Sequence, residues 1–288
     1  MLDRRSFILT SLAASAFSAS MLVGCGGSPA TNDEADAGDS TEEAGTGAVD
    51  TGKLIVGFDS SYPPYGYVGD DGEYTGFDLE LAQEVAARNE WEVQLEPIDW
   101  DAKDTMLDSG AINCIWNGFT MEGREDDYTF SEPYMINGQV VVTRADSGIA
   151  SFDDLAGKAV ITQVDSAAYN VLAGEDATQA ELAATFASLE TIGDYNTAFM
   201  QLESGAVDAV ACDLSIAAYQ LAAKPDAYVQ LDEFLSEEHY AVGFKKGDDA
   251  TATTVTDTLR AMDEDGFVAD LCDKYAADGI SYDNWCLS

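Results

Sequence analysis

The fold is decided by a segment that occurs twice: MLDSGAINCIWNG at residues 106–118 and QLESGAVDAVACD at residues 201–213, 95 positions later. Each copy reads as the end of a helix, a turn at Ser-Gly and a buried strand. Because Leu, Ser, Gly and Ala recur at matching positions, the repeat predicts two lobes of similar topology rather than one continuous sheet. The alternative is a chance recurrence of a common helix–turn–strand pattern.

The strand that closes each copy ends in polar or small residues. These are Asn117 and Gly118 in the first copy, and Cys212 and Asp213 in the second. In open α/β sheets, ligands bind beyond the carboxyl ends of the strands. Two such ends that face each other would form a cleft, so the repeat predicts a binding site between the lobes.

Short apolar runs alternate with amphipathic segments around the first copy, which is typical of an α/β protein. Strands are expected at residues 53–58, 92–97 and 111–116, and helices at residues 78–89 and 101–108. Asp78 is the expected N-cap of the first helix. Ser109 and Gly110 are expected to end the second helix.

Residues 1–24 have the features of an export signal. Arg4 and Arg5 precede a short apolar run at residues 12–23, which suits a cleavable signal peptide and is too short to span a bilayer stably. The paired arginines resemble a twin-arginine signal, although any basic segment there would look similar. The run ends in a lipobox, Leu-Val-Gly-Cys, so Cys25 is expected to carry lipid at the outer face of the cytoplasmic membrane. The alternative is an unmodified, buried cysteine.

Residues 25–52 are expected to form a disordered, acidic linker behind this lipid anchor. The segment has no aromatic residue and almost no large apolar residue, and so it cannot bury enough surface to fold. Its seven acids are Asp33, Glu34, Asp36, Asp39, Glu42, Glu43 and Asp50. Residues 53–288 are long enough for one large domain or two modest ones.

The composition is strongly acidic, since 54 Asp and Glu against 13 Lys and Arg give a formal net charge of −41. Phosphates and anionic lipid surfaces repel such a chain, so nucleic acid is not an expected partner. The charge is interpreted as an adaptation to solubility or salt. His239 is the single histidine and is expected to be structural. Without a Cys-x-x-Cys pair, neither a metal nor a cofactor is predicted.

Six motifs run through the rest of the chain in a specific order and spacing. They are VGFDSSYPPYGY at 56–67, YTGFDL at 74–79, IDW at 98–100, GFT at 118–120 with Arg124, FSEPY at 130–134 and SGAVDA at 204–209. Each motif is weak alone. Together they make residues 53–275 resemble the bacterial solute-binding proteins of polar amino-acid ABC transporters, family 3.

The resemblance implies a two-lobed, periplasmic-binding-protein-like fold of type II, with two hinge strands and a central cleft. The first lobe is expected to contain residues 53–142 and the returning segment 240–288, and the second lobe residues 143–239. The two crossings between lobes are expected near residues 140–144 and 240–244.

The resemblance also implies how a ligand's charged ends are held. Arg124 and Thr120 match the positions that hold a carboxylate, and Ser166 with the amide of Ala167 matches the contribution of the second lobe. Asp213 matches the carboxylate that meets the ligand's ammonium group. The physical requirement agrees, because a zwitterion taken from water needs an opposite charge at each end.

The remaining expected contacts surround the ligand's side chain. Tyr62 and Trp100 match aromatic positions that sandwich it. Asp59 matches a position that in some members grips a side-chain amine or amide. Gly118 and Gln163 complete the expected ligand-binding residues, and no catalytic residue is expected.

Each of these roles has a plainer alternative. Arg124 could pair with neighbouring acids at the surface, and Asp213 could cap the helix that follows it. Tyr62 and Trp100 could be ordinary core residues, and Asp59 could be a strand-end carboxylate that faces water or a neighbouring backbone amide.

The sequence departs from the family pattern at two places. Three residues separate Thr120 from Arg124, whereas most members have four, so the approach of the arginine to the ligand is expected to differ. Trp116 and Asn117 are bulkier than the small residues often found at this strand end, which would reshape the pocket.

The four cysteines after Cys25 are expected to differ in state. Cys272 and Cys286 are close in sequence near the C-terminus, and a disulfide between them is expected in an exported protein. Cys114 and Cys212 fall on equivalent strands of different lobes, so both are expected to be buried free thiols.

The favoured function is that of a substrate-binding lipoprotein of an ABC importer. It would capture a small polar amino acid by lobe closure, as a monomer, and deliver it to the membrane permease. One alternative is a catalytic member of the same fold, such as a cyclohexadienyl dehydratase-like enzyme, although no nucleophile and base pair stands out. The other is a sensory ectodomain, which would need a transmembrane segment that the sequence after residue 25 does not show.

Overall fold

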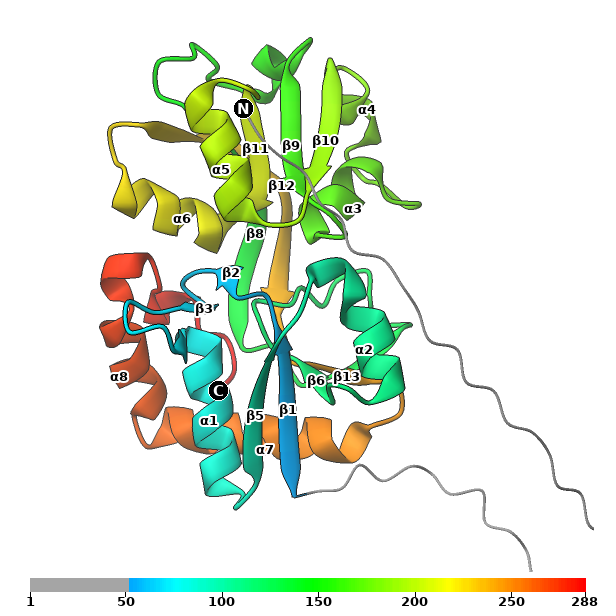
Figure 1. Ribbon diagram of the computed structural model, residues 1–288, viewed down its shortest axis with the longest axis vertical. Helices are drawn as coiled ribbons and strands as arrows, with labels where there is room; N and C mark the ends of the chain where they lie inside the picture. The colour runs from blue at the N-terminus through cyan, green and yellow to red at the C-terminus, as the bar shows by residue number, and fades with distance from the viewer. Residues whose placement is uncertain (1–51) are drawn as a thin grey trace, which may run out of the picture. The chain divides into compact units, whose positions relative to one another are not determined.

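The computed structural model of the protein describes residues 52–288 (Figure 1). The expected signal peptide, the lipidation site at Cys25 and nearly all of the acidic linker lie outside the described residues. Within the described part, no helix has the length and apolar character needed to cross a bilayer. The same part holds no cluster of His, Cys, Asp and Glu suited to a metal ion.

The first lobe contains a five-stranded sheet. Its strands, in spatial order, are β5 Glu92–Pro97, β1 Lys53–Phe58, β6 Cys114–Ile115, β13 Gly243–Lys245 and β7 Tyr128–Phe130. β1 pairs in parallel with β5 and β6, while β13 is antiparallel to β6 and β7. β1 and β5 have the predicted bounds. β6 is shorter than predicted because the amides of Ala111 and Ile112 bond back to the carbonyl of Met106 at the end of the preceding helix.

Helices cover both faces of this sheet. They are α1 Phe77–Arg88, α2 Lys103–Ser109, α7 Asp249–Glu264 and α8 Phe267–Lys274. Because side chains alternate along a strand, Val56 of β1 joins a cluster that contains Val85 of α1 and Leu259 of α7. Ile55 instead contacts a second cluster around Leu107 of α2. The two apolar clusters therefore lie on opposite faces of the sheet.

Small elements complete the described chain. A three-stranded sheet is formed by β2 Ser61–Tyr62, β3 Gly66–Val68 and β4 Tyr74–Thr75. Single 3₁₀ turns are η1 Trp100–Ala102, η2 Phe152–Leu155, η3 Ala276–Asp278 and η4 Tyr282–Asn284. The helix predicted at residues 101–108 is thus a 3₁₀ turn followed by α2.

The predicted N-cap of the first long helix is wrong. α1 begins at Phe77 after Gly76, and the side chain of Asp78 is fully buried. Its carboxylate accepts a hydrogen bond from the amide of Gly118 at 2.6 Å and another from the hydroxyl of Tyr134 at 2.8 Å. Asp78 is therefore turned into the lobe, where it fixes the chain that follows β6.

The second lobe contains another five-stranded sheet. Its strands, in spatial order, are β10 Ser188–Ile192, β9 Ala159–Gln163, β11 Ala209–Asp213, β8 Met135–Arg144 and β12 Tyr228–Tyr240. β9 is parallel to β10 and β11, and β8 is antiparallel to β11 and β12. The helices of this lobe are α3 Ala167–Ala173, α4 Ala180–Ala183, α5 Tyr195–Ser204 and α6 Leu214–Ala223.

The long strands β8 and β12 run side by side and connect the lobes (Figure 1). β8 pairs with β11 only from Gln139 onward, and its first four residues pair with β12, with one further bridge from Met135 to Trp285 of the C-terminal tail. The first crossing therefore lies at residues 135–138, before the expected range 140–144, because Gln139 already belongs to the second sheet. β12 ends at Tyr240, and the chain enters the first sheet again at Gly243.

The repeated segment has the predicted structure in both lobes. In the first copy α2 ends at Gly110, whose φ and ψ are 77° and 15°, and β6 follows. In the second copy α5 ends at Gly205, with values of 77° and 16°, and β11 follows. The shared glycine is explained by this left-handed helix end, which side chains other than glycine rarely adopt.

The predicted disulfide is not formed. Cys272 and Cys286 are free thiols, as are Cys114 and Cys212. Cys272 is buried in the core of the first lobe, packed among the side chains of α1, α7 and α8. The thiol of Cys286 instead approaches the carbonyl of Pro133 at 3.5 Å, because the tail pairs with the segment just before β8.

Candidate ligand-binding site

A small cavity lies between the lobes, where the chain leaves β6 and β11. Its volume is about 10 Å³, roughly the space for one water molecule, so an amino acid enters only if the lobes separate. The lining residues are Tyr62, Trp100, Gly118, Thr120, Arg124, Gln163, Ser166, Ala167 and Asp213. The cavity thus brings together nine of the ten expected ligand-binding residues, and Asp59 is the one outside it.

Arg124 places a buried positive charge in this cavity. Its Nη1 donates to the carbonyl of Thr120 at 2.9 Å and its Nη2 to the carbonyl of Asp165 at 3.4 Å, while the guanidinium stacks 4.8 Å from the ring centroid of Phe119. No carboxylate of residues 52–288 forms an ion pair with it. The plainer interpretation, pairing with surface acids, therefore finds no support in these contacts.

A tight turn explains how Arg124 reaches the cavity across the shortened spacing. The amide of Arg124 donates to the carbonyl of Met121 at 3.1 Å. Gly123 has a φ of 79° and open space around its Cα. The left-handed glycine reverses the chain within three residues, and the arginine side chain folds back onto Thr120.

Asp213 ends β11 with its carboxylate turned inward rather than over the helix that follows. It occupies the cap position of α6 but makes no side-chain cap hydrogen bond. Instead its Oδ1 accepts hydrogen bonds from Gln139 at 2.7 Å, Tyr240 at 3.0 Å and Asn137 at 3.1 Å. Burial raises the pKa of Asp213 above its ordinary value. The predicted cap alternative is therefore wrong for the side chain.

A second buried carboxylate, Glu238 on β12, lies beside Asp213. Its side chain is 3% exposed, and its Oε1 accepts from Thr120 at 2.8 Å and from both Asn137 and Gln139 at 2.7 Å. Because the two carboxylates share both amide donors, they lie close together. Burial, followed by the charge of Asp213, raises the pKa of Glu238 to about 7.

Sequence reasoning missed four functional candidates on the hinge strands: Asn137, Gln139, Glu238 and Tyr240. A signal for them exists. Asn137 and Gln139 are two residues apart near the start of β8, before the run of three valines. Glu238 and Tyr240 are likewise two residues apart at the end of β12. Residues two apart lie on one face of a strand, so each pair marks a polar face inside the molecule.

The aromatic side chains close the cavity from the first lobe. The hydroxyl of Tyr62 lies 3.3 Å from that of Tyr240, and its ring packs 6.0 Å from that of Tyr195 in the second lobe. Trp100 packs edge-on against Phe119 with a centroid distance of 5.7 Å. Both rings contact other aromatic groups, so packing and ligand contact are compatible roles for them.

Gly118 and Ser166 present backbone and hydroxyl groups from the two lobes. Gly118 has a φ of 57°, and a Cβ there would fall 3.1 Å from atoms of Tyr62 and Tyr240. Ser166 caps α3, because its Oγ accepts the amide of Tyr169 at 3.1 Å. A larger residue than glycine at position 118 would therefore crowd the aromatic wall.

Asp59 and Gln163 link the lobes directly. The Oδ2 of Asp59 accepts from Gln163 at 2.6 Å, and its Oδ1 accepts from the amide of Ser61 at 2.7 Å. Burial raises the pKa of Asp59 to about 6. A further ion pair joins Lys103 of the first lobe to Asp165 of the second, and burial lowers the pKa of Lys103. The lobes are therefore in contact around the cavity.

Comparison with known proteins matches this architecture to one family. Residues 54–278 match the bacterial extracellular solute-binding proteins, family 3. The chain belongs to this family. As a family 3 protein, it has the type II two-lobed fold and a substrate-binding role, and the family is extracellular.

Several relatives of this family 3 protein are named for the amino acid they bind. The L-cystine-binding protein TcyJ of Escherichia coli (strain K12) is 32% identical over 232 residues, covering 78% of this chain and 82% of TcyJ. A probable histidine-binding protein of Neisseria gonorrhoeae is 26% identical, covering 96% of this chain and 97% of that protein. A glutamine-binding protein of Geobacillus stearothermophilus is 29% identical, covering 82% and 91%.

Two solved structures show the same fold. An ABC uptake transporter substrate binding protein from Streptococcus pneumoniae with bound histidine superposes with a TM-score of 0.75 at 30% identity, over 81% of this chain and 95% of that chain. The ancestral amino acid-binding protein AncCDT-1, a precursor of cyclohexadienyl dehydratase, gives a TM-score of 0.70 at 29% identity, over 78% and 95%.

Proposed function

We propose that this protein is the lipid-anchored receptor of an ABC importer and binds a free polar amino acid between its lobes. The observation that carries the proposal is the pair of opposite charges in one cavity. Within residues 52–288 the guanidinium of Arg124 donates hydrogen bonds only to backbone carbonyls, and Asp213 faces the same space from the other lobe. These are the two charges that a zwitterion requires.

Each part of the ligand has a counterpart in the cavity. The carboxylate would bind the guanidinium of Arg124 and the hydroxyl of Ser166, and also the hydroxyl of Thr120 once this group turns away from Glu238. The ammonium would meet Asp213. Since these groups come from both lobes, a bound zwitterion would hold the closed form, and the permease would recognise that form.

The dehydratase alternative has one specific observation in its favour. Glu238 is a buried carboxyl beside the cavity with a pKa of about 7, which suits a general acid or base near neutral pH, and the similar AncCDT-1 is a precursor of such an enzyme. We propose binding rather than turnover because the named relatives are amino-acid-binding proteins. A dehydratase assay on the purified protein separates the two functions.

The binding proposal is tested by thermal unfolding of the full-length protein, stripped of co-purified ligand by refolding from denaturant. Each of the twenty amino acids, together with cystine and ornithine, is added in turn. A ligand at 100 times its dissociation constant should stabilise the fold by about 2.7 kcal/mol. We expect Arg124→Ala to abolish that stabilisation, because the carboxylate loses its partner.

The matched control is Arg260→Ala, which removes an arginine that pairs with Glu132 on the surface of the first lobe. This variant should keep the full ligand response. If no amino acid stabilises the folded wild type, or if Arg124→Ala responds as the wild type does, the amino-acid proposal is wrong.

The anchoring part of the proposal needs its own measurement. Cells that express the full chain are labelled with a radioactive fatty acid. Label should appear in the wild type and disappear in Cys25→Ser, and an unlabelled wild type would contradict the lipid anchor.

A further inference from the structure

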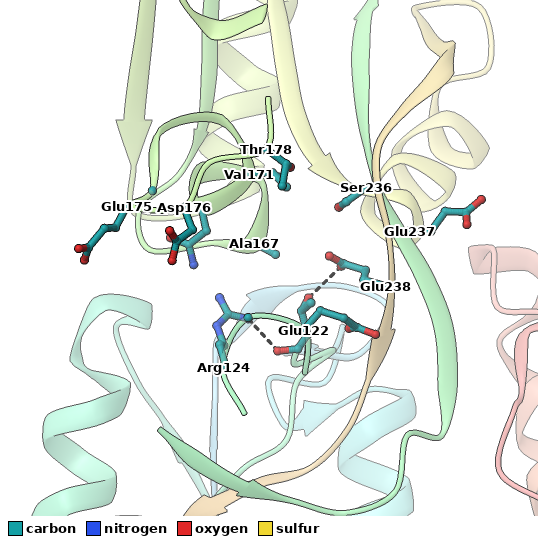
Figure 2. A pocket seen from close by; sticks show the side chains of 14 residues that line it. Glu122, Arg124, Ala167, Val171, Glu175, Asp176, Thr178, Ser236, Glu237 and Glu238 are labelled. Carbon is teal, nitrogen blue, oxygen red and sulfur yellow. Dashed lines mark hydrogen bonds between the residues drawn. The ribbon is translucent and has the colours of Figure 1, made fainter. Parts of the chain in front are cut away.

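A second, larger cavity opens beside the proposed amino-acid cleft. Its volume is about 390 Å³, within the range of small-molecule sites. It shares Thr120, Arg124 and Ala167 with the cleft, so the two spaces are neighbours. The wall is completed by the start of the loop after α3 and by the hinge strand β12 (Figure 2).

Five of the residues that line this cavity are acidic. The lining carboxylates are Glu122, Glu175, Asp176, Glu237 and Glu238, and Arg124 is the lining base. Glu122 is already engaged with the ring of His239 at 2.7 Å. Figure 2 shows Glu237 pointing away from the cavity and Glu238 pointing into it, toward Arg124 and Ala167.

Acids on the surface are common in a protein of net charge −41. Glu238 differs from them because it is buried. Its side chain is only 3% exposed. Its Oε1 takes three hydrogen bonds, but its Oε2 receives none from residues 52–288. Because Glu238 lines the larger cavity, this oxygen without a donor is available as an acceptor for a group that enters the cavity from outside.

Asp59, which matches the family position expected to grip a ligand's side-chain amine or amide, has no free carboxylate oxygen of this kind. Both of its oxygens accept hydrogen bonds, from Gln163 and Ser61, and it does not line the cleft. The space for a side chain and the free acceptor oxygen, that of Glu238, are therefore found in the larger cavity, which Arg124 also lines.

We infer that the larger cavity is a second half of the ligand site, in which Glu238 and Asp176 receive a basic nitrogen at the far end of a long amino acid. The inference rests on the proposed function, which places the ligand's head between Arg124 and Asp213. The substrate class is an amino acid with a second ammonium or guanidinium group. It includes diamino diacids, which carry a second α-amino and α-carboxyl group at the far end.

The electrostatics agree with this assignment. Glu238 has a raised pKa because burial and the nearby Asp213 disfavour its charge. A cation in the cavity would supply the missing opposite charge. Asp176 is exposed on the second lobe, so a basic group between it and β12 would bridge a lobe to the hinge.

The test is isothermal titration calorimetry on the full-length protein, freed of co-purified ligand, with L-ornithine, L-lysine, L-arginine and L-cystine as probes. L-glutamine and L-leucine are the neutral probes. We expect at least one basic or diamino probe to bind the wild type, and Glu238→Gln to weaken it by about tenfold or more. Neutral probes that bind should change by less than about threefold.

Two further variants keep the result interpretable. Asp176→Asn, at an exposed position, should weaken the same probes even if Glu238→Gln folds poorly. Asp232→Asn is the matched control, since Asp232 is exposed on β12 and does not line the cavity, and it should bind as the wild type does.

The outcomes separate the two proposals. If only neutral probes bind the wild type, or if basic probes bind both folded variants unchanged, the second half of the site is overturned while the proposed function stands. A loss in Glu238→Gln that is equal for neutral and basic probes would also overturn it, because that pattern indicates a structural role. If no amino acid binds at all, the proposed function itself fails.

Discussion

Glu238 stands among polar groups from three elements. Thr120 follows β6, Asn137 and Gln139 come from β8, and all three donate to its Oε1. The charged groups that face it are Asp213 at the end of β11 and, across the larger cavity, Arg124. The hydrogen bonds lower its pKa, but burial and Asp213 outweigh them.

This residue predicts a pH dependence of ligand affinity. With a pKa of about 7, the carboxyl of Glu238 is mostly charged at pH 8 and mostly neutral at pH 6. The ammonium groups of lysine or ornithine stay charged over this range, so affinity for them should fall, by up to about tenfold, as pH is lowered from 8 to 6. Calorimetry at both pH values measures the change.

Glu238→Gln is the control for this titration, because it cannot lose a charge over the range. Its affinity for the same probes should depend much less on pH. A pH profile in the variant that equals the wild-type profile would assign the titration to a group other than Glu238.

For individual residues, the sequence predicts which side chains line the candidate site but not which groups they hydrogen-bond to. Motifs lead directly to Arg124 and Asp213, and the structure brings both to one cavity. The burial of Asp78 was not predicted, because a residue at the start of a helix usually caps it, whereas here it accepts the amide of Gly118. Hydrogen bonds between segments 40 or 100 residues apart leave no local pattern in a sequence.

Among the elements, the repeated helix end is the most predictable, because its physics is local. Gly110 and Gly205 both hold a left-handed conformation, and a Cβ on Gly110 would meet no atom within 4 Å. We therefore expect Gly110→Ala to lower the free energy of unfolding by about 1–2 kcal/mol through backbone strain alone, and Gly110→Asn to lower it less. Urea unfolding measures both.

The control for the helix-end prediction is Gly193→Ala. Gly193 also has open space around it but lacks a left-handed φ, so this variant should be close to neutral. Equal losses at positions 110 and 193 would show that the cost comes from something other than the left-handed conformation.

The hinge strands are the elements that the sequence described least well. The start of β8 looks like any apolar strand with two polar interruptions, and its crossing was expected several residues too late. What sets the crossing is the register with β11, which begins at Gln139. Registers between distant strands depend on tertiary pairing and cannot be derived from the composition of one strand.

For the molecule as a whole, the order of elements follows from the motifs, but the contacts between lobes do not. The Lys103 to Asp165 ion pair and the Asp59 to Gln163 hydrogen bond join side chains more than 60 positions apart. The predicted disulfide failed for a similar reason: proximity in sequence near the C-terminus does not decide which way Cys272 and Cys286 face.

Three buried carboxyls together predict how the stability of the whole molecule varies with pH. Burial raises the pKa of Asp59 to about 6, and those of Asp78 and Glu238 to about 7. Unfolded carboxyls titrate near pH 4, so between about pH 4 and 7 the folded protein binds more protons than the unfolded chain. The free energy of unfolding should therefore fall as pH rises through this window, by an amount on the order of a few kcal/mol.

Urea unfolding of the ligand-free protein at pH 5 and pH 8 measures this fall. Self-repulsion of the acidic chain also grows with pH, so the decisive quantity is the difference between wild type and Asp78→Asn. The asparagine can still accept hydrogen bonds from Gly118 and Tyr134 but cannot ionise, and it should remove the share of the pH dependence that belongs to Asp78. If both proteins lose the same stability between pH 5 and pH 8, Asp78 is already ionised in the fold at pH 5, and its two donors outweigh its burial.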